Sequence, residues 1–187
     1  MEEIILEDKN AMIFLNNLGN STFDQFWILV SETWFWIPLY VIFIFLLSKN
    51  YSKKSLFYIL LFVALGITIS DQIANIFKYG FHRLRPCHDP SLEGLIREVK
   101  CGGKFGFYSA HASNVFFIAS YLTLLLGKKL KYFTVFIFSW AALVAYSRIY
   151  LGVHFPGDVL FGAFMGAVLG FFFSKLAIKV INKSEKK

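Results

Sequence analysis

Two histidines and one carboxylate are the residues of this sequence best suited to chemistry. His154 and Asp158 are four residues apart, so on a helix or turn they share a face. The carboxylate can then hold the imidazole in one tautomer and stabilise its cation. His111 supplies a second imidazole from a different segment. When one imidazole attacks a phosphorus atom, the other can protonate the leaving oxygen, so the three residues suit phosphoryl transfer.

Cations occur in the same regions of the chain. Lys78, Arg85 and Arg148 lie at the ends of apolar runs. An Arg fork binds two oxygens of a phosphate, and a Lys adds a point charge. Ser109 precedes a predicted helix start, where free backbone N–H groups also bind anions. A single cation at the end of a span often only extends to the membrane interface, but together with the histidines these residues favour a phosphate site.

The composition indicates that these residues belong to a membrane protein. Hydrophobic residues make up 57% of the 187 residues, aromatic residues 19% and charged residues 17%, whereas a soluble domain has about 25% charged residues. These values exclude a disordered chain, a coiled coil and a small disulfide scaffold. The net charge of +7 does not indicate nucleic-acid binding, because the basic residues form short clusters between apolar runs.

We predict an all-α, polytopic membrane helix bundle with five spanning helices and an N-terminal amphipathic helix. A span needs about 20 mostly apolar residues. The predicted spans are 26–47, 56–77, 110–127, 132–146 and 159–181. Residues 1–22 are expected to lie in the membrane interface, residues 23–182 to form the membrane-embedded domain, and residues 183–187 a basic tail. Gly162, Gly166 and Gly170 recur every four residues, which favours close helix packing.

The charges predict the orientation of the chain in the membrane. Eleven of the 19 Lys and Arg residues fall on one side of the predicted spans, where Glu185 is the only acid. The Lys-rich side, which carries the C-terminus, should be cytoplasmic. The N-terminus and the candidate site then face outward. We therefore expect a multi-pass protein of the bacterial inner (cytoplasmic) membrane with a periplasmic site.

The two cysteines lie in the long outward loop between the second and third predicted spans. The outward compartment permits a disulfide between Cys87 and Cys101, and we favour this interpretation. Free thiols are one alternative. A zinc site that adds His88 and perhaps His82 is another, although its spacing matches no standard finger.

The three outward clusters together resemble the type 2 phosphatidic acid phosphatase family, which is related to vanadium haloperoxidases and bacterial acid phosphatases. The family signature is K-x6-R-P, then P-S-G-H, then S-R-x5-H-x3-D. The residues that match the first and third elements in full are Lys78, Arg85 and Pro86, then Ser147, Arg148, His154 and Asp158. The middle element is variant and reads Tyr108-Ser109-Ala110-His111. The resemblance covers about residues 56–180.

The resemblance implies a mechanism without a metal or other cofactor. His154 would be the nucleophile that forms a phosphohistidine, Asp158 its orienting base, and His111 the general acid. The phosphate would be bound by Lys78, Arg85, Ser109 and Arg148, and by the backbone N–H of Ala110. Membrane members commonly have six helices and an active site at the outer face that accepts lipid phosphates.

We therefore expect a lipid phosphate or pyrophosphate phosphatase whose partners are its lipid substrate and the bilayer, with no nucleic acid. Undecaprenyl pyrophosphate is the favoured substrate, and phosphatidylglycerol phosphate, phosphatidic acid and lipid A also fit. One alternative is a phosphotransferase that uses the same site. Another is a non-hydrolytic protein that binds or transports anions or lipid phosphates.

Overall fold

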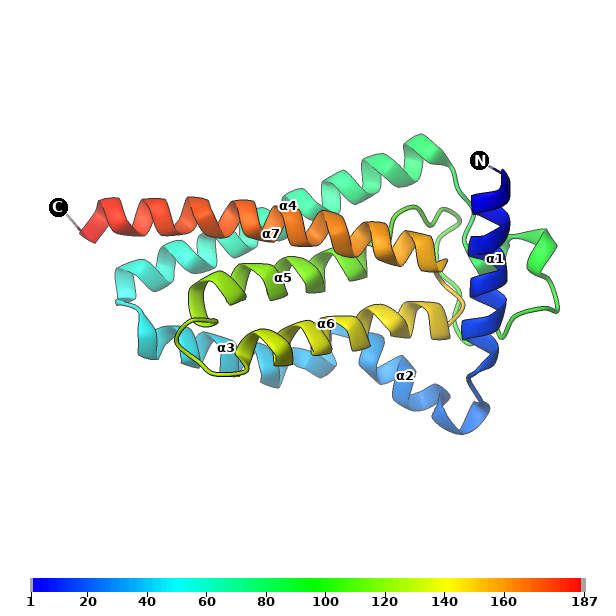
Figure 1. The fold of residues 1–187 in the computed structure, drawn as a ribbon, viewed down its shortest axis with the longest axis horizontal. Coiled ribbons are helices and arrows are strands. Elements are labelled where there is room, and N and C mark those ends of the chain that lie inside the picture. Colours follow the sequence, from blue (N-terminus) through cyan, green and yellow to red (C-terminus); the bar gives the residue numbers. More distant parts are fainter. Residues whose placement is uncertain (1, 186–187) are drawn as a thin grey trace.

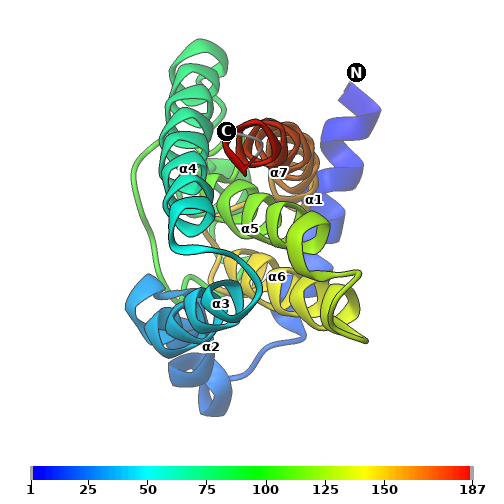
Figure 2. The same cartoon turned by 90° about the vertical axis from the view of Figure 1, so that its left-hand side faces the viewer.

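Five apolar helices run side by side along the long axis of the molecule (Figure 1). They are α3 (Ile37–Asn50), α4 (Lys53–Phe81), α5 (Ala110–Leu126), α6 (Phe133–Tyr150) and α7 (Pro156–Glu185). The computed structural model describes residues 2–185, and this part of the chain is all-α. Helix α5 lies in the middle and packs against α4, α6 and α7 (Figure 2).

Two shorter helices precede the bundle. They are α1 (Glu2–Asn17) and α2 (Asp24–Ser31). Helix α1 crosses the end of the bundle near the start of α7 (Figure 1). Asn16, which is fully buried, donates from Nδ2 to the carbonyls of Ile149 and Tyr150 at 3.2 and 2.8 Å. These bonds fix α1 to the end of α6, where the candidate site lies. The interfacial position of residues 1–22 stays a prediction.

Within residues 2–185, four segments are long and apolar enough to cross a membrane. They are Thr33–Asn50, Lys53–Phe81, Phe133–Tyr150 and Pro156–Glu185. The predicted span 110–127 corresponds to α5, which is apolar but has only 17 residues. The structure therefore has four candidate spans where the sequence predicted five. Helix α5 lies in the centre of the bundle, packed against α4, α6 and α7.

The first predicted span, 26–47, is confirmed as a candidate span over Thr33–Asn50, but its start is wrong, because residues 26–47 are not one helix. Helix α2 ends at Ser31, Glu32 is extended (φ −87°, ψ 129°), and a 3-10 turn over Thr33–Trp36 leads into α3. Pro38 lies in the first turn of α3. Proline is tolerated at a helix start but breaks a helix interior, because it lacks an N–H and its ring clashes with the preceding turn. The break faces the candidate site.

The glycine repeat brings α7 against α5. A Cβ added to Gly162, Gly166 or Gly170 would overlap a backbone carbonyl oxygen of α5. Each of these glycines therefore allows backbone-to-backbone approach, as the spacing predicted. This packing sets the start of α7 beside the start of α5, and the backbone N–H of Ser109 donates to the carbonyl of Asp158 at 3.1 Å.

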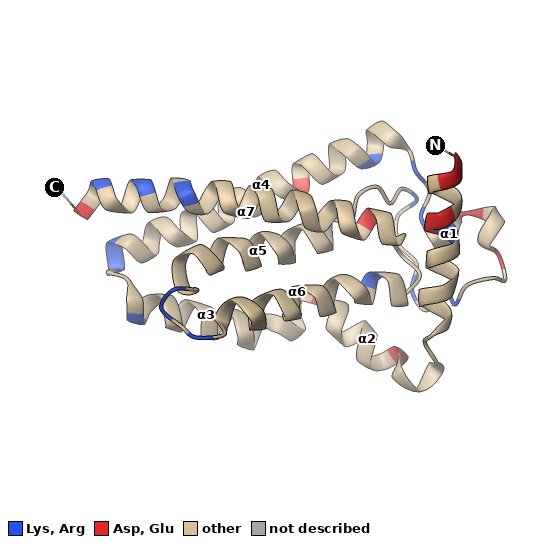
Figure 3. Cartoon of the chain, viewed as in Figure 1, with Lys and Arg blue, Asp and Glu red and all other residues tan. Residues whose placement is uncertain are grey.

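The charges separate along the bundle (Figure 3). Lysines gather at the end that holds the α5–α6 connection and the C-terminal part of α7. Most acids lie at the opposite end, around α1 and the long loop after α4. Such an asymmetry fits a multi-pass membrane protein.

Candidate active site

The loop after α4 folds back on itself and places two arginines. Leu84 and Phe105 form an isolated antiparallel bridge. Side chains alternate along extended backbone, so Arg83 and Arg85 project to the same side of this bridge. Both reach the site: Arg83 binds Asp158, and Arg85 lines a cavity. The two arginines therefore contact different parts of the site.

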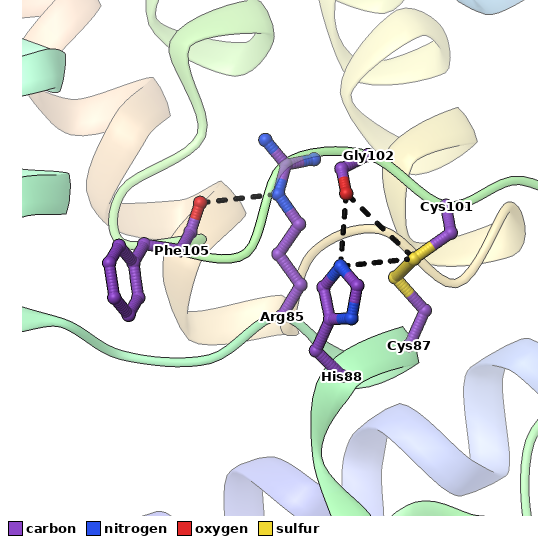
Figure 4. Close-up of a disulfide and its surroundings, with 6 residues drawn as sticks. All are labelled: Arg85, Cys87, His88, Cys101, Gly102 and Phe105. Atoms are coloured by element: carbon purple, nitrogen blue, oxygen red, sulfur yellow. Dashed lines mark hydrogen bonds between the residues drawn. A yellow bond between two sulfur atoms is a disulfide. The ribbon is translucent and has the colours of Figure 1, made fainter.

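A disulfide holds the two arms of this loop together (Figure 4). Cys87 and Cys101 are bonded, with an S–S distance of 2.04 Å. The Nε2 atom of His88 lies 3.0 Å from the carbonyl oxygen of Gly102. Because both cysteines are used in the bond, they offer no thiolate to a zinc ion. His82 lies elsewhere, at the end of α4, where it adopts a left-handed conformation (φ 50°).

The turn between α6 and α7 positions His154. The backbone N–H groups of Val153 and His154 both donate to the carbonyl of Arg148, at 3.1 and 3.2 Å. Gly152 has a left-handed conformation (φ 81°), and an added Cβ would meet the carbonyl oxygen of Arg97 at 2.9 Å. Glycine is therefore required in this tight turn. The turn brings His154 back toward Arg148.

His154 and Asp158 are paired and buried. The Nδ1 atom of His154 lies 3.6 Å from Oδ2 of Asp158, and the two side chains are 2% and 0% exposed. This distance exceeds a hydrogen bond, and catalytic contacts often tighten only when substrate binds. Burial, together with the charges of Arg85 and Arg148, holds the pKa of His154 well below its ordinary value of 6.5. These surroundings favour the neutral form of the imidazole, the form that can act as a nucleophile.

Ser109 begins α5. Its hydroxyl accepts a hydrogen bond from the backbone N–H of Ala112 at 3.4 Å, so it serves as the N-cap. Ala110 is the first helical residue, and His111 follows in the first turn. The side chain of Ser109 is fully buried. Ser109, which the sequence predicts to bind phosphate, caps the helix that carries His111.

A polar cavity of about 270 Å³ lies between the break after α2, the long loop and the start of α5. The lining residues are Ser31, Glu32, Thr33, Arg85, Lys100, Cys101, Gly102, His111, Arg148 and Val153. The structure thus brings Arg85, His111 and Arg148 to one cavity. Lys78, in the last turn of α4, lies outside this lining set.

Arg85 and Arg148, which line the cavity, and Lys78 have no carboxylate partner within residues 2–185, unlike Lys100, which lines the same cavity and pairs with Glu32. Lys9, Arg83, Arg97 and Lys100 each form ion pairs of 2.6 or 2.7 Å. Within residues 2–185, Arg85, Arg148 and Lys78 form none. Arg148 is only 6% exposed, and its Nε has no hydrogen-bond partner in this part of the chain. An uncompensated buried charge is costly, so these cations are suited to an anion that arrives with the substrate.

Two further cavities continue from the polar one. A cavity of about 230 Å³ shares Ser31, Thr33 and His111 with it. A third cavity, of about 220 Å³, shares Tyr40 and Ile118 with the second. The third is lined by apolar and aromatic residues of α3, α4 and α5. Shared lining residues thus link the cavity at the cations, through the second cavity, to an apolar cavity between α3, α4 and α5.

Several lining residues were missed by the sequence analysis. Ser31, Glu32 and Thr33 face the cavities only because the helix breaks there, and the sequence predicted a continuous span. Lys100 reaches the cavity from the long loop and pairs with Glu32 at 2.6 Å. Pro38 was the signal for the break, since proline favours the first turn of a helix.

The sequence profile of the PAP2 superfamily matches residues 56–181, which include all three outward clusters. The chain belongs to this superfamily. The resemblance inferred from the three clusters is thereby confirmed, and the chain is a membrane phosphatase. Its relatives include the Porphyromonas gingivalis lipid A 4'-phosphatase, 35% identical over 179 residues, which cover 94% of this chain and 75% of that protein. The Bacteroides thetaiotaomicron lipid A 4'-phosphatase is 34% identical, with coverage of 92% and 78%.

Solved structures show the same fold. The crystal structure of Aquifex aeolicus LpxE aligns with a TM-score of 0.69 at 26% identity, covering 89% of this chain and 93% of that one. A PAP2 type phosphatidylglycerolphosphate phosphatase from Bacillus subtilis aligns with a TM-score of 0.71 at 24% identity, covering 97% and 89%. Membership in this phosphatase family argues against the non-hydrolytic alternative.

Proposed function

We propose that this PAP2 phosphatase hydrolyses a phosphate monoester of lipid A, through a phosphohistidine on His154. The observation that carries the proposal is the row of cavities from the unpaired cations to the apolar cavity. A phosphate fits among Arg85 and Arg148, while the apolar part of a lipid fits along α3, α4 and α5. A soluble phosphate ester would have no use for the apolar cavity.

The reaction proceeds in two steps. A ring nitrogen of His154 attacks phosphorus, the bond between phosphorus and the lipid oxygen breaks, and His111 gives that oxygen a proton. Water then attacks the phosphohistidine while His111 takes the water's proton, and the bond between phosphorus and nitrogen breaks. Inorganic phosphate and free His154 result. His111 suits this role because it is exposed to the cavity.

Fixed cations stabilise the charge on the transferring phosphoryl group. Arg85 and Arg148 line the cavity, and Lys78 adds charge from the end of α4. The backbone N–H groups at the start of α5, at Ala110 and behind the Ser109 cap, bind a further oxygen. Asp158 orients His154 and stabilises the imidazolium form. These residues supply the electrostatics of the reaction, and the proposal needs no metal.

The charge asymmetry supports an outward-facing site. The lysine-rich end would lie in the cytoplasm and the site at the periplasmic face of a bacterial inner membrane. Helix α5 would cross as a short fifth segment inside the bundle, and α1 would lie in the interface. Lipid phosphates of the outer leaflet would then reach the cavity from the side of the bundle.

The similarity to lipid A 4'-phosphatases changes the lipid that we favour as substrate. The residues alone favoured undecaprenyl pyrophosphate, but no side chain was identified that reads the lipid. Two lipid A 4'-phosphatases that align with more than nine-tenths of this chain support lipid A instead. Undecaprenyl pyrophosphate and phosphatidylglycerol phosphate serve as comparison substrates.

The experiment is phosphate release by the purified protein in detergent, with EDTA present. We compare wild type, His154→Ala and His82→Asn. His82 lies outside the cavity lining, and its left-handed conformation suits asparagine. Mass spectrometry of the lipid product identifies which phosphate has left.

We expect wild type and His82→Asn to release phosphate from lipid A faster than from the comparison lipids. His154→Ala should release none. Faster hydrolysis of undecaprenyl pyrophosphate would restore the first choice of lipid. No release from any of the three lipids by folded wild type would overturn the proposal, and transfer of the phosphoryl group to an added acceptor would then identify a transferase.

A further inference from the structure

Arg83 links the catalytic pair to the N-terminal helix. Its Nη1 donates to Oδ1 of Asp158 at 2.7 Å, and its Nη2 donates to Oδ2 of Asp8 at 2.6 Å. The guanidinium also lies over the ring of Phe155, 4.2 Å from its centroid. One arginine therefore joins the first turn of α7 to α1, which crosses that end of the bundle (Figure 1).

The two oxygens of the Asp158 carboxylate have different partners. Oδ1 accepts from Arg83, whereas Oδ2 faces Nδ1 of His154 and accepts from the N–H of Phe155 at 3.1 Å. Asp158 is fully buried. A buried carboxylate needs partners for both oxygens, and a bond to only one of them would let the group rotate. Arg83 thus fixes the oxygen that His154 does not use.

Asp8 holds the same turn in a second way. Its Oδ1 accepts from the backbone N–H of Gly157 at 2.7 Å, directly beside Asp158. The Asp8 carboxylate of α1 therefore accepts hydrogen bonds from both Arg83 and the first turn of α7. An added Cβ on Gly157 would meet this carboxylate at 2.8 Å, so the two segments pack closely.

We propose that Arg83 and Asp8 are positioning residues, which hold Asp158 in the rotamer that orients His154 for attack. The inference rests on the proposed function, since it assigns a task to the same catalytic pair. It gives the N-terminal helix, which lies outside the matched region 56–181, a direct part in turnover. We assign neither side chain to the substrate, because Nη1 and Nη2 of Arg83 and both carboxylate oxygens of Asp8 already have partners.

The test uses variants of both residues and a matched control on the same helix. Arg83→Met and Asp8→Asn remove the links, and Arg83→Lys keeps the charge. Lys9→Met is the control, because Lys9 pairs with Asp89 at 2.7 Å and ties α1 to the same loop away from the catalytic pair. We measure kcat, KM and Tm of each full-length protein, with the lipid that wild type hydrolyses fastest.

Misplacing a catalytic group by about 1 Å can cost about 100-fold in rate, so we expect kcat to fall about 100-fold in Arg83→Met and about tenfold in Asp8→Asn. KM should stay within about threefold in both, since neither residue binds substrate. Arg83→Lys should recover part of the loss. The double variant should lose less than the product of the single losses, because both residues act on Asp158.

Three results would overturn the inference. The first is a kcat within about twofold of Lys9→Met in both single variants. The second is a rise in KM with kcat retained, which would make Arg83 a phosphate contact. The third is a loss of kcat that tracks Tm equally in all variants, including Lys9→Met, which would mean a purely structural role. Failure of the proposed function looks different, because wild type itself would then release no phosphate.

Discussion

Replacing Arg148 by Met should abolish turnover and yet stabilise the empty protein. The side chain is 6% exposed and forms no ion pair within residues 2–185. Arg85 lines the same cavity and likewise forms no ion pair within residues 2–185, so two like charges share the cavity. Replacing buried charges by apolar groups of similar volume often stabilises a protein by about 1–4 kcal/mol. We expect a gain of about 1 kcal/mol in the free energy of unfolding, at the low end of this range, because the cavity admits water. This gain corresponds to a rise in Tm of about 2–4 °C.

In the proposed mechanism, the same substitution removes the Arg148 guanidinium, which is a donor to the transferring phosphoryl group. Loss of one such donor typically costs about 100- to 1,000-fold in kcat, or about 3–4 kcal/mol. Phosphate release and thermal unfolding in detergent measure the two effects. Inorganic phosphate, at 100 times its Kd, should stabilise wild type by about 2.7 kcal/mol and the variant by much less. Arg97→Met is the control, because Arg97 is paired with Asp24 at 2.6 Å, and its loss should lower Tm with little effect on kcat.

The reasoning would be refuted by either of two results. One is a variant at Arg148 that keeps more than about a tenth of wild-type kcat, since an unpaired donor in the cavity would then contribute little. The other is a variant that is less stable than wild type while phosphate still stabilises it fully. That outcome would mean that Arg148 holds the fold together rather than the substrate.

Three other outcomes follow from the geometry. Gly166→Ala should destabilise the protein by about 1–3 kcal/mol in thermal unfolding, because the added Cβ would overlap α5. Gly80→Ala is the control and should leave the stability unchanged, since an added Cβ there meets nothing within 4 Å. Equal losses of stability in the two variants would contradict the packing of α7 on α5. Replacing Cys87 and Cys101 together by Ser should cost about 2–4 kcal/mol, a loss that reductant reproduces in wild type alone. Because the pKa of His154 lies below 6.5, only the unfolded chain gains a proton as pH falls from about 7.5 to 5.5. Over this pH range, wild type should therefore lose about 1 kcal/mol more of its free energy of unfolding than His154→Gln does. The same pH dependence of Tm in both proteins would contradict this prediction.

Local patterns in the sequence were sufficient to identify the family and to select candidate site residues that the structure places at one end of the bundle. His154 and Asp158 are four residues apart in the sequence. The tight turn at Gly152 places both residues at the end of the bundle where His111 lies. A chain returns to the same face of a membrane after every second crossing. The positions of the predicted spans therefore place the three clusters on one face without coordinates. The glycine repeat likewise predicted where backbones approach.

Contacts between distant segments could not be predicted in this way. Asp8 and Arg83 are separated by 75 positions, and no local pattern relates a carboxylate on an N-terminal helix to an arginine after α4. The break after Ser31 was missed because the apolar run continues through it, and hydropathy does not register a 3-10 turn. Ser109 caps α5, and this role follows from its place before a helix, whereas its proposed contact with phosphate rests on the family resemblance.

Trapping the phosphorylated protein tests the central claim most directly. Wild type is mixed with the lipid substrate, quenched during turnover under conditions that preserve phosphohistidine, and digested for mass spectrometry. We predict one phosphoryl group on the peptide that contains His154, and none in His154→Ala. A wild type that releases phosphate without any labelled histidine, or with the label on His111, would contradict the assignment of His154 as the nucleophile.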